Sequence, residues 1–139
     1  MSAPVLASSR PKGIRPDLSW PLLPVPGEDG RLAWPDLDRS VREMIEIVLR
    51  TTPGEQLLRP DFGAGLERMI HQPNTVTTRA RMRDAVATAL RRFERRIILD
   101  DVVVEEDSDP NIVLVAIRYR LRHNGQPGAV KAAVSVGRA

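Results

Sequence analysis

The sequence IVLVAIRYRLR, residues 112–122, alternates between two kinds of side chain and decides the fold class. Its period of two predicts a β-strand with one face buried and one face open to solvent. The predicted buried side consists of Val113, Val115, Ile117, Tyr119 and Leu121, and the other side of Ile112, Leu114, Ala116, Arg118, Arg120 and Arg122.

Two more strands are predicted beside this one. Asn124-Gly125 is typical of a tight hairpin turn, and residues 129–136 form the predicted return strand. One face of that strand carries Val130, Ala132, Val134 and Val136. The β-branched segment 97–105 predicts the remaining strand, and the acidic residues that follow it predict a turn.

Helical patterning precedes the strands. Apolar residues spaced three or four apart predict one helix over residues 36–51 and another over 75–92, with a short helix just after Gly65. Helices followed by strands predict an α+β fold: two main helices and a short one packed on a small antiparallel or mixed sheet. Seven of the twelve prolines lie in the first 35 residues and exclude long helices there, so we expect a flexible proline-rich arm over 1–16 and a single domain over 17–139.

Composition excludes several classes of protein and site. The chain of 139 residues has no cysteine, which rules out disulfides and thiolate metal sites, and its two histidines, His71 and His123, lie far apart, so we expect no metal or other cofactor. No apolar run reaches the ~20 residues of a transmembrane helix, and no secretory signal is visible near Met1. The acidic run 105–109 lacks the glycine and the glutamate spacing of an EF-hand, which favours a solvated turn.

Catalytic motifs are also missing. The nucleophile elbow, the zinc-protease motif and the phosphate-binding loop are absent from the sequence. Glu94, Asp100 and Asp101 are close in sequence, but no motif places two carboxylates on one cleft, as glycoside hydrolysis requires. We therefore expect a protein that is not an enzyme.

A nucleic-acid-binding domain is one alternative, because the net charge is +3, the sequence pI is about 10.1 and 19 of the 21 bases are arginine. The second long helix alone carries Arg79, Arg81, Arg83, Arg91 and Arg92. Against this alternative, 18 acidic residues nearly balance the bases, and aromatic residues for base stacking are scarce.

A more specific pattern joins three segments: IVLRTTPGEQ (47–56), RPDFGAGL (59–66) and LRRFERRI (90–97). Their order resembles the baseplate wedge, or sheath initiator, family of contractile phage tails, type VI secretion systems, R-type pyocins and phage-tail-like injection particles. The resemblance covers residues 20–122. It departs from the family pattern at Gln56, where an arginine is usual, and at Arg95, where a proline is usual.

The resemblance implies a structural baseplate component that docks on the wedge core. The implied wedge-binding residues are Gly54, Glu55, Pro60, Phe62, Gly63, Glu94, Arg95 and Arg96. It also implies six copies per baseplate, assembly in the cytoplasm and incorporation into a virion or contractile particle. The expected partners are wedge proteins, the sheath subunit and inner tube or hub proteins, with no nucleic acid and no membrane.

The resemblance further implies that the sheet starts the sheath by accepting a strand from the first sheath ring, which is β-augmentation. The residues expected at this contact are Arg118, Arg120, Arg122, Val130, Ala132, Val134 and Val136. We expect the three arginines near a sheet edge, where they would discourage self-pairing and select an acidic partner. A muramidase-type hydrolase of the baseplate is the other alternative, because some phage members of the family have carried a lysozyme label.

Two local expectations follow from the residues themselves. Gly54, Gly63 and Gly65 permit backbone shapes that side chains forbid, and Phe62, one of two phenylalanines, is predicted to anchor its loop on the core. Glu94 and Arg96 are expected to form an exposed ion pair that contributes little to stability.

Overall fold

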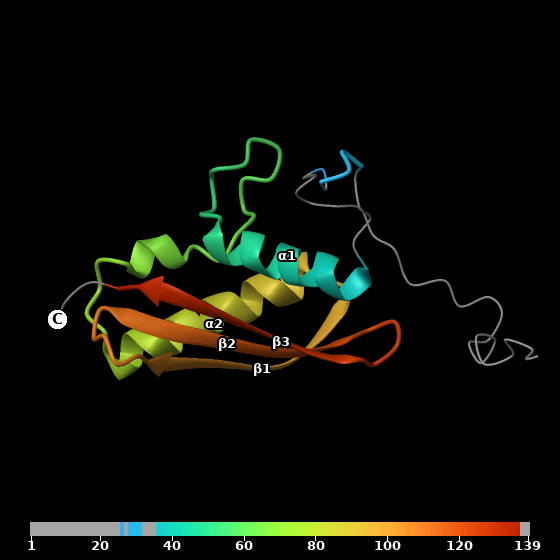
Figure 1. The fold of residues 1–139 in the computed structure, drawn as a ribbon. Helices are drawn as coiled ribbons and strands as arrows, with labels where there is room; N and C mark the ends of the chain where they lie inside the picture. Colours follow the sequence, from blue (N-terminus) through green and yellow to red (C-terminus); the bar gives the residue numbers. More distant parts are fainter. Residues whose placement is uncertain (1–25, 27, 32–35, 137–139) are drawn as a thin grey trace, which may run out of the picture. The chain divides into compact units, whose positions relative to one another are not determined.

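The computed structural model describes residues 26, 28–31 and 36–136. The elements follow the predicted order (Figure 1): α1 Leu37–Arg50, the 3₁₀-helix η2 Leu66–Met69, α2 Val76–Phe93, β1 Ile97–Glu106, β2 Ile112–Leu121 and β3 Pro127–Ser135. The α+β prediction is confirmed, and the sheet is antiparallel throughout. The predicted arm, residues 1–16, lies outside the described residues.

Contacts divide the chain into two units, residues 1–40 and 41–139. In the first unit, α1 begins where the carboxylate of Asp36 accepts a hydrogen bond from the Arg39 N–H at 2.8 Å, as an N-cap residue does. The sheet, α2 and the surfaces described below belong to the second unit.

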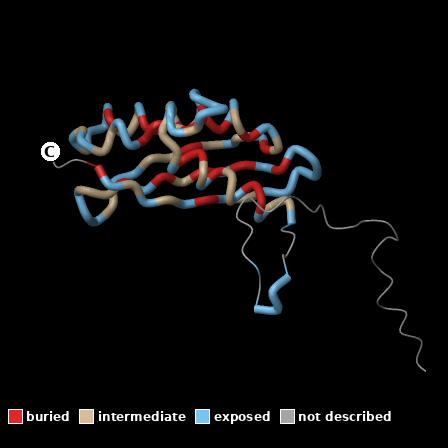
Figure 2. Tube along the Cα trace, turned by 90° about the horizontal axis from the view of Figure 1, so that it is seen from above, coloured by how far each residue is buried: buried red, intermediate tan, exposed pale blue. Residues whose placement is uncertain are grey.

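β2 is the central strand of the sheet, with β1 and β3 on either side of it. Its side chains alternate in burial as the sequence predicted, and Val113, Val115 and Ile117 are completely buried. Figure 2 shows buried residues interleaved with less buried ones along the chain. The register with β3 is regular along all nine paired residues, whereas the register with β1 shifts between Leu99 and Asp101. This irregularity is a β-bulge, which sends both Asp100 and Asp101 towards the solvent side of the sheet.

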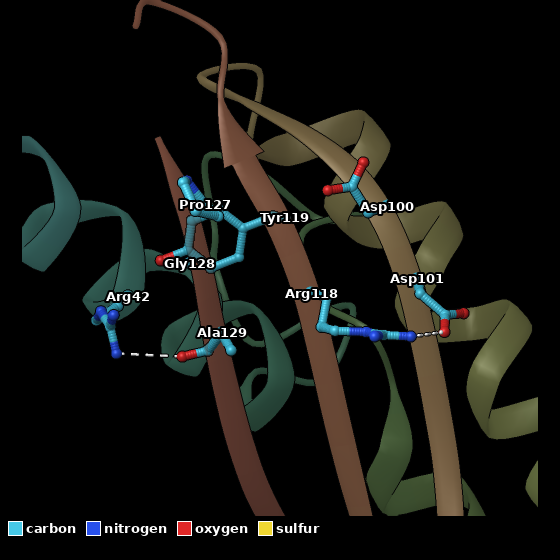
Figure 3. A pocket seen from close by; sticks show the side chains of 8 residues that line it. All are labelled: Arg42, Asp100, Asp101, Arg118, Tyr119, Pro127, Gly128 and Ala129. Carbon is cyan, nitrogen blue, oxygen red and sulfur yellow. Dashed lines mark hydrogen bonds and ion pairs between the residues drawn. The ribbon is translucent and has the colours of Figure 1, made fainter. Parts of the chain in front are cut away.

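Both α-helices lie on the same side of the sheet (Figures 1 and 3). They fill the core with side chains that are fully buried: Ile45 and Val48 of α1 and Met82, Val86 and Leu90 of α2. Thr75 caps α2 by accepting a hydrogen bond from the Thr78 N–H at 3.2 Å. Among the described residues, no helix is long and apolar enough to span a bilayer.

The β2–β3 hairpin contains the predicted Asn124-Gly125 turn. Gly125 has a φ of 72°, and its N–H donates to the Leu121 carbonyl at 2.8 Å. Gly128 follows on β3 opposite Tyr119, and a Cβ at Gly128 would overlap the tyrosine ring. Glycine at position 128 therefore allows the ring of Tyr119 to lie across β3, where it is 1% exposed.

Candidate functional site

The loop between α1 and η2 is held to the core by Phe62. This side chain is 1% exposed, and its ring centroid lies 4.9 Å from that of Phe93 at the end of α2. The Arg59 guanidinium covers the Phe62 ring at 4.4 Å from its centroid. Phe62 is thus buried as predicted, and it fixes the loop against α2.

The loop base is also fixed at Gly63. Its φ is 118°, and a Cβ here would overlap the backbone carbonyl of Thr51. The next residue, Ala64, donates its N–H to the Val48 carbonyl near the end of α1 at 2.9 Å. An ion pair between Asp61 and Arg92 adds a link to α2.

The structure separates the expected wedge-binding residues of the loop into two groups. Gly54, Glu55 and Pro60 are exposed, whereas Phe62 and Gly63 are buried and face the protein interior. The neighbouring Leu57 and Leu58 are 97% and 96% exposed, and neither is among the residues predicted for this surface. The sequence did carry a signal for their exposure. Gly54 and Pro60 on either side are typical of a surface turn, in which apolar side chains do not reach the core.

A second candidate surface lies where α2 turns into β1. α2 ends because Glu94 leaves the helical region, with φ −114° and ψ 85°. Its carboxylate accepts hydrogen bonds from the Arg96 backbone N–H at 3.0 Å, from Arg96 Nε at 2.9 Å and from Arg96 Nη2 at 2.6 Å. The pKa of Arg96 is raised, chiefly by the hydrogen bond to Glu94.

The expectation of an exposed pair at this corner was wrong. The Glu94 side chain is 2% exposed and that of Arg96 33%. The Glu94 carboxylate is turned towards Arg96 and accepts hydrogen bonds from its backbone N–H and its guanidinium group. The burial of this carboxylate depends on tertiary packing and could not be predicted from the neighbouring residues. Arg95, in contrast, is exposed.

Arg122 belongs to the same corner. Its backbone N–H donates to the Arg96 carbonyl at 2.8 Å, and its side chain donates to the carbonyls of Arg95 at 3.1 Å and of Ile97 at 3.4 Å. A hollow of about 300 Å³ lies here between the end of α2 and the start of β1. Arg122 thus lies at this corner, one residue beyond the end of β2.

Arg118 and Arg120 lie on the open face of β2, and the expectation of a position near a sheet edge was wrong because β2 is central. Arg118 donates to Asp101 at 2.8 Å, and Arg120 makes a bidentate contact with Asp100 through Nε at 3.0 Å and Nη2 at 2.8 Å. The bulge in β1 thus supplies acidic partners from within the chain. These contacts raise the pKa of Arg120 and lower that of Asp101.

Among the described residues β3 is an edge strand, and its hydrogen bonds to the neighbouring chain segments show which of its backbone groups face outward. Leu121 N–H bonds to the Gln126 carbonyl and Val136 N–H to the Asn111 carbonyl, so the even-numbered residues of β3 are directed at β2. Val130, Ala132, Val134 and Val136 belong to this set, and their side chains point to the helix-covered face. The outward backbone groups therefore belong to Ala129, Lys131, Ala133 and Ser135.

One side chain already uses this edge. Arg42 of α1 donates from Nη1 to the Ala129 carbonyl at 3.1 Å (Figure 3). Arg42, Gly128 and Ala129 line a hollow of about 900 Å³ that also reaches Asp100 and Asp101. The two carboxylates are held by arginines, and the lowered pKa of Asp101 is the opposite of what a general acid needs.

The arginines of α2 also have internal acidic neighbours. Arg79 lies 3.6 Å from Glu106 and bonds to Asn74 at 2.7 Å, and Arg83 lies 3.4 Å from Asp84. Within the described ranges, no group of three or more histidine, aspartate or glutamate residues is arranged to hold a metal ion.

The chain is similar in sequence to a known protein family and to a phage protein. The model of the family "Baseplate wedge protein gp25" matches residues 35–126. Baseplate protein W of Escherichia phage P2 is 28% identical over 95 residues, which cover 68% of this chain and 82% of that protein.

Three solved structures share the fold. A protein of Geobacter sulfurreducens, described as a candidate tail lysozyme, is 25% identical with a TM-score of 0.71, over 78% of this chain and 99% of that one. A chain of the anti-feeding prophage baseplate has a TM-score of 0.58 at 18% identity, covering 86% and 85% of the two chains. A chain of the type VI secretion system baseplate complex has a TM-score of 0.56 at 16% identity, covering 70% and 92%.

Proposed function

The chain belongs to the baseplate wedge protein gp25 family and is a structural component of a contractile-tail baseplate wedge; from this premise we propose that it docks on the wedge core and starts the sheath by strand addition. Docking uses the loop between α1 and η2 together with the corner at residues 94–96. Strand addition uses the outward edge of β3. The observation that carries the proposal is the family match over residues 35–126, which include both docking elements and the central strand.

At the corner, docking depends on basic side chains whose backbone is fixed by hydrogen bonds. The buried Glu94 holds Arg96 by three hydrogen bonds, and Arg122 holds the backbone of Arg95. Arg95 is therefore an exposed cation on a preorganised corner, which suits recognition of an acidic or carbonyl-rich surface. Glu94 acts as a positioning residue and does not itself face the partner.

Charge reversal tests the corner. Arg95→Glu is expected to leave the melting temperature near that of the wild type, because the side chain is exposed, and to weaken binding to the purified wedge proteins at least ~tenfold. Arg81→Glu, an equal charge change at an exposed position of α2, is the matched control and should bind normally. Equal binding by both variants would remove the corner from the docking surface.

The edge of β3 supports strand addition for two reasons. Within the part of the chain that the structure describes, β3 pairs on one side only, with β2. Its regular register presents evenly spaced outward groups at Lys131, Ala133 and Ser135, as an added strand requires, beyond the Ala129 carbonyl that Arg42 already binds. β1, the other edge strand, is a poorer template because it carries the bulge at Leu99–Asp101.

Proline variants test this edge without breaking the sheet. Lys131→Pro and Ala133→Pro each remove an outward N–H, whereas the bonds to β2 come from the even-numbered residues. Folded variants should still enter baseplates but yield baseplates and tubes without sheath, as seen by electron microscopy. Lys131→Ala keeps the N–H and should assemble normally. Full-length sheaths in both folded proline variants would exclude strand addition at β3.

We also propose that the protein is not an enzyme, although one fold relative is described as a candidate tail lysozyme. The support is that Asp100 and Asp101, the carboxylates lining the large hollow, form ion pairs with Arg120 and Arg118. A retaining or inverting hydrolase needs one carboxyl with a raised pKa, and that of Asp101 is lowered. Peptidoglycan release equal to a buffer blank is the expected result.

Stoichiometry and location follow from the same proposal. One copy per wedge gives six copies in a six-fold baseplate, assembled in the cytoplasm before the particle is complete. The sheath subunit and the wedge proteins are the direct partners, and inner tube or hub proteins are neighbours.

A further inference from the structure

Leu57 and Leu58 are the most exposed large hydrophobic residues described in the chain, at 97% and 96%. Single exposed leucines are common on protein surfaces and need no explanation. Two consecutive exposed leucines do need an explanation, because the same loop buries the apolar side chain of Phe62 only four residues later. The loop therefore separates an inward apolar anchor from an outward apolar tip.

The tip is held out by a fixed base. Figure 1 shows the segment after α1 rising away from the helices before it returns to η2. Phe62 packs against Phe93 at its returning end, and Ala64 N–H bonds to the Val48 carbonyl. At its starting end, Thr52 Oγ1 donates to Glu67 of η2 at 2.7 Å. Both limbs are thus tied to the body of the domain.

Short-range hydrogen bonds also shape the tip itself. Glu55 N–H donates to the Thr52 carbonyl at 3.1 Å, while Thr52 N–H donates to the Glu55 carboxylate at 3.1 Å. Beyond the leucines, Arg59 N–H donates to the Gln56 carbonyl at 3.2 Å. Successive turns of this kind reduce the freedom that the loop would lose on binding.

We propose that Leu57 and Leu58 form an apolar plug that inserts into an apolar groove of another wedge protein, a proposal that rests on the loop docking proposed above. A convex apolar tip is complementary to a concave apolar site, and it is already shaped for insertion. Exposed charges of both signs flank it in sequence: Glu55, Arg59 and Asp61. This mixture fits a protein groove with a mixed charged rim better than an anionic lipid surface, which favours a uniformly basic surround.

A double substitution tests the plug. Leu57→Ser/Leu58→Ser should keep the melting temperature within about 2 °C of the wild type, because both side chains are almost fully exposed. Its affinity for a purified complex of the wedge proteins of the same particle should fall by ~tenfold or more. Val76→Ser removes another exposed apolar side chain, 75% exposed at the start of α2, and should bind like the wild type.

Four other results would overturn the plug. Wild-type affinity in the folded double variant would remove the leucines from the docking surface while leaving wedge docking intact. Leucine-dependent flotation with phosphatidylcholine–phosphatidylglycerol vesicles would identify a lipid anchor, and leucine-dependent dimers in analytical ultracentrifugation would identify a self-contact. Failure of the wild-type chain itself to bind the wedge complex would overturn both the plug and the proposed docking.

Discussion

Truncation of Phe62 to alanine is expected to loosen the whole loop between α1 and η2. The side chain is 1% exposed, and its removal leaves a cavity beside Phe93 and withdraws the ring on which Arg59 lies. A buried Phe→Ala change costs about 3–5 kcal/mol, of which the aromatic pair accounts for ~1 kcal/mol. For a domain of this size, that free energy lowers the melting temperature by about 10–25 °C.

Thermal and urea denaturation followed by circular dichroism measure this loss. Leu57→Ala in the same loop is the matched control, because its side chain is 97% exposed and its truncation should change stability by less than about 0.5 kcal/mol. If Phe62→Ala melts within a few degrees of the wild type while Leu57→Ala behaves as expected, Phe62 is not the anchor of the loop and the reasoning from its burial fails.

Three other changes have expected outcomes. Arg96→Ala should lower the free energy of unfolding by about 2–4 kcal/mol in urea titrations, since it removes both guanidinium hydrogen bonds from the buried Glu94 carboxylate and leaves it only the Arg96 backbone N–H; an unchanged midpoint would contradict this. Gly63→Ala should lower it by about 3 kcal/mol or more, through strain at φ 118° and overlap with backbone; a melt like the wild type would show that the loop base can shift. The pKa of Asp101 is lowered in the folded state, so its contact with Arg118 stabilises the fold above the unfolded pKa of about 4, and this stabilisation is lost as the pH falls through the folded pKa. Asp101→Asn should therefore show a smaller fall in melting temperature between about pH 5 and pH 2 than the wild type. A slope equal to that of the wild type would show that the Arg118 contact is not maintained in solution.

The helices, strands and hairpin could be predicted because their signals are local. The alternation of residues 112–121 and the Asn124-Gly125 turn depend on near neighbours along the chain, and the structure follows them closely. The burial of Phe62 could be predicted for a related reason, since a large aromatic side chain in a glycine-rich loop is most stable when it packs into the core.

The chemistry of the surfaces could not be predicted in the same way. Glu94 looked like an exposed partner of Arg96 because no local rule says that the corner will be covered. Arg118 looked like an edge residue because strand order is a tertiary property, and its partner Asp101 is brought into place by a bulge in β1.

The direction of the backbone N–H and C=O groups of β3 could not be predicted from the sequence either. Its apolar residues Val130 and Val134 marked the strand, but the groups available to an added strand belong to the intervening positions. Side-chain patterning shows which face is buried, whereas the outward N–H groups depend on the hydrogen-bonded register with β2.

A cryo-electron microscopy reconstruction of an assembled baseplate that contains this chain tests the central claim most directly. We predict that the loop between α1 and η2 and the corner at Arg95 contact the wedge core, and that a strand of the first sheath ring pairs with β3 through Lys131 and Ala133. A reconstruction in which the sheath meets the chain elsewhere while the edge of β3 stays unpaired, or in which the wedge core contacts neither the loop nor the corner, would contradict the account.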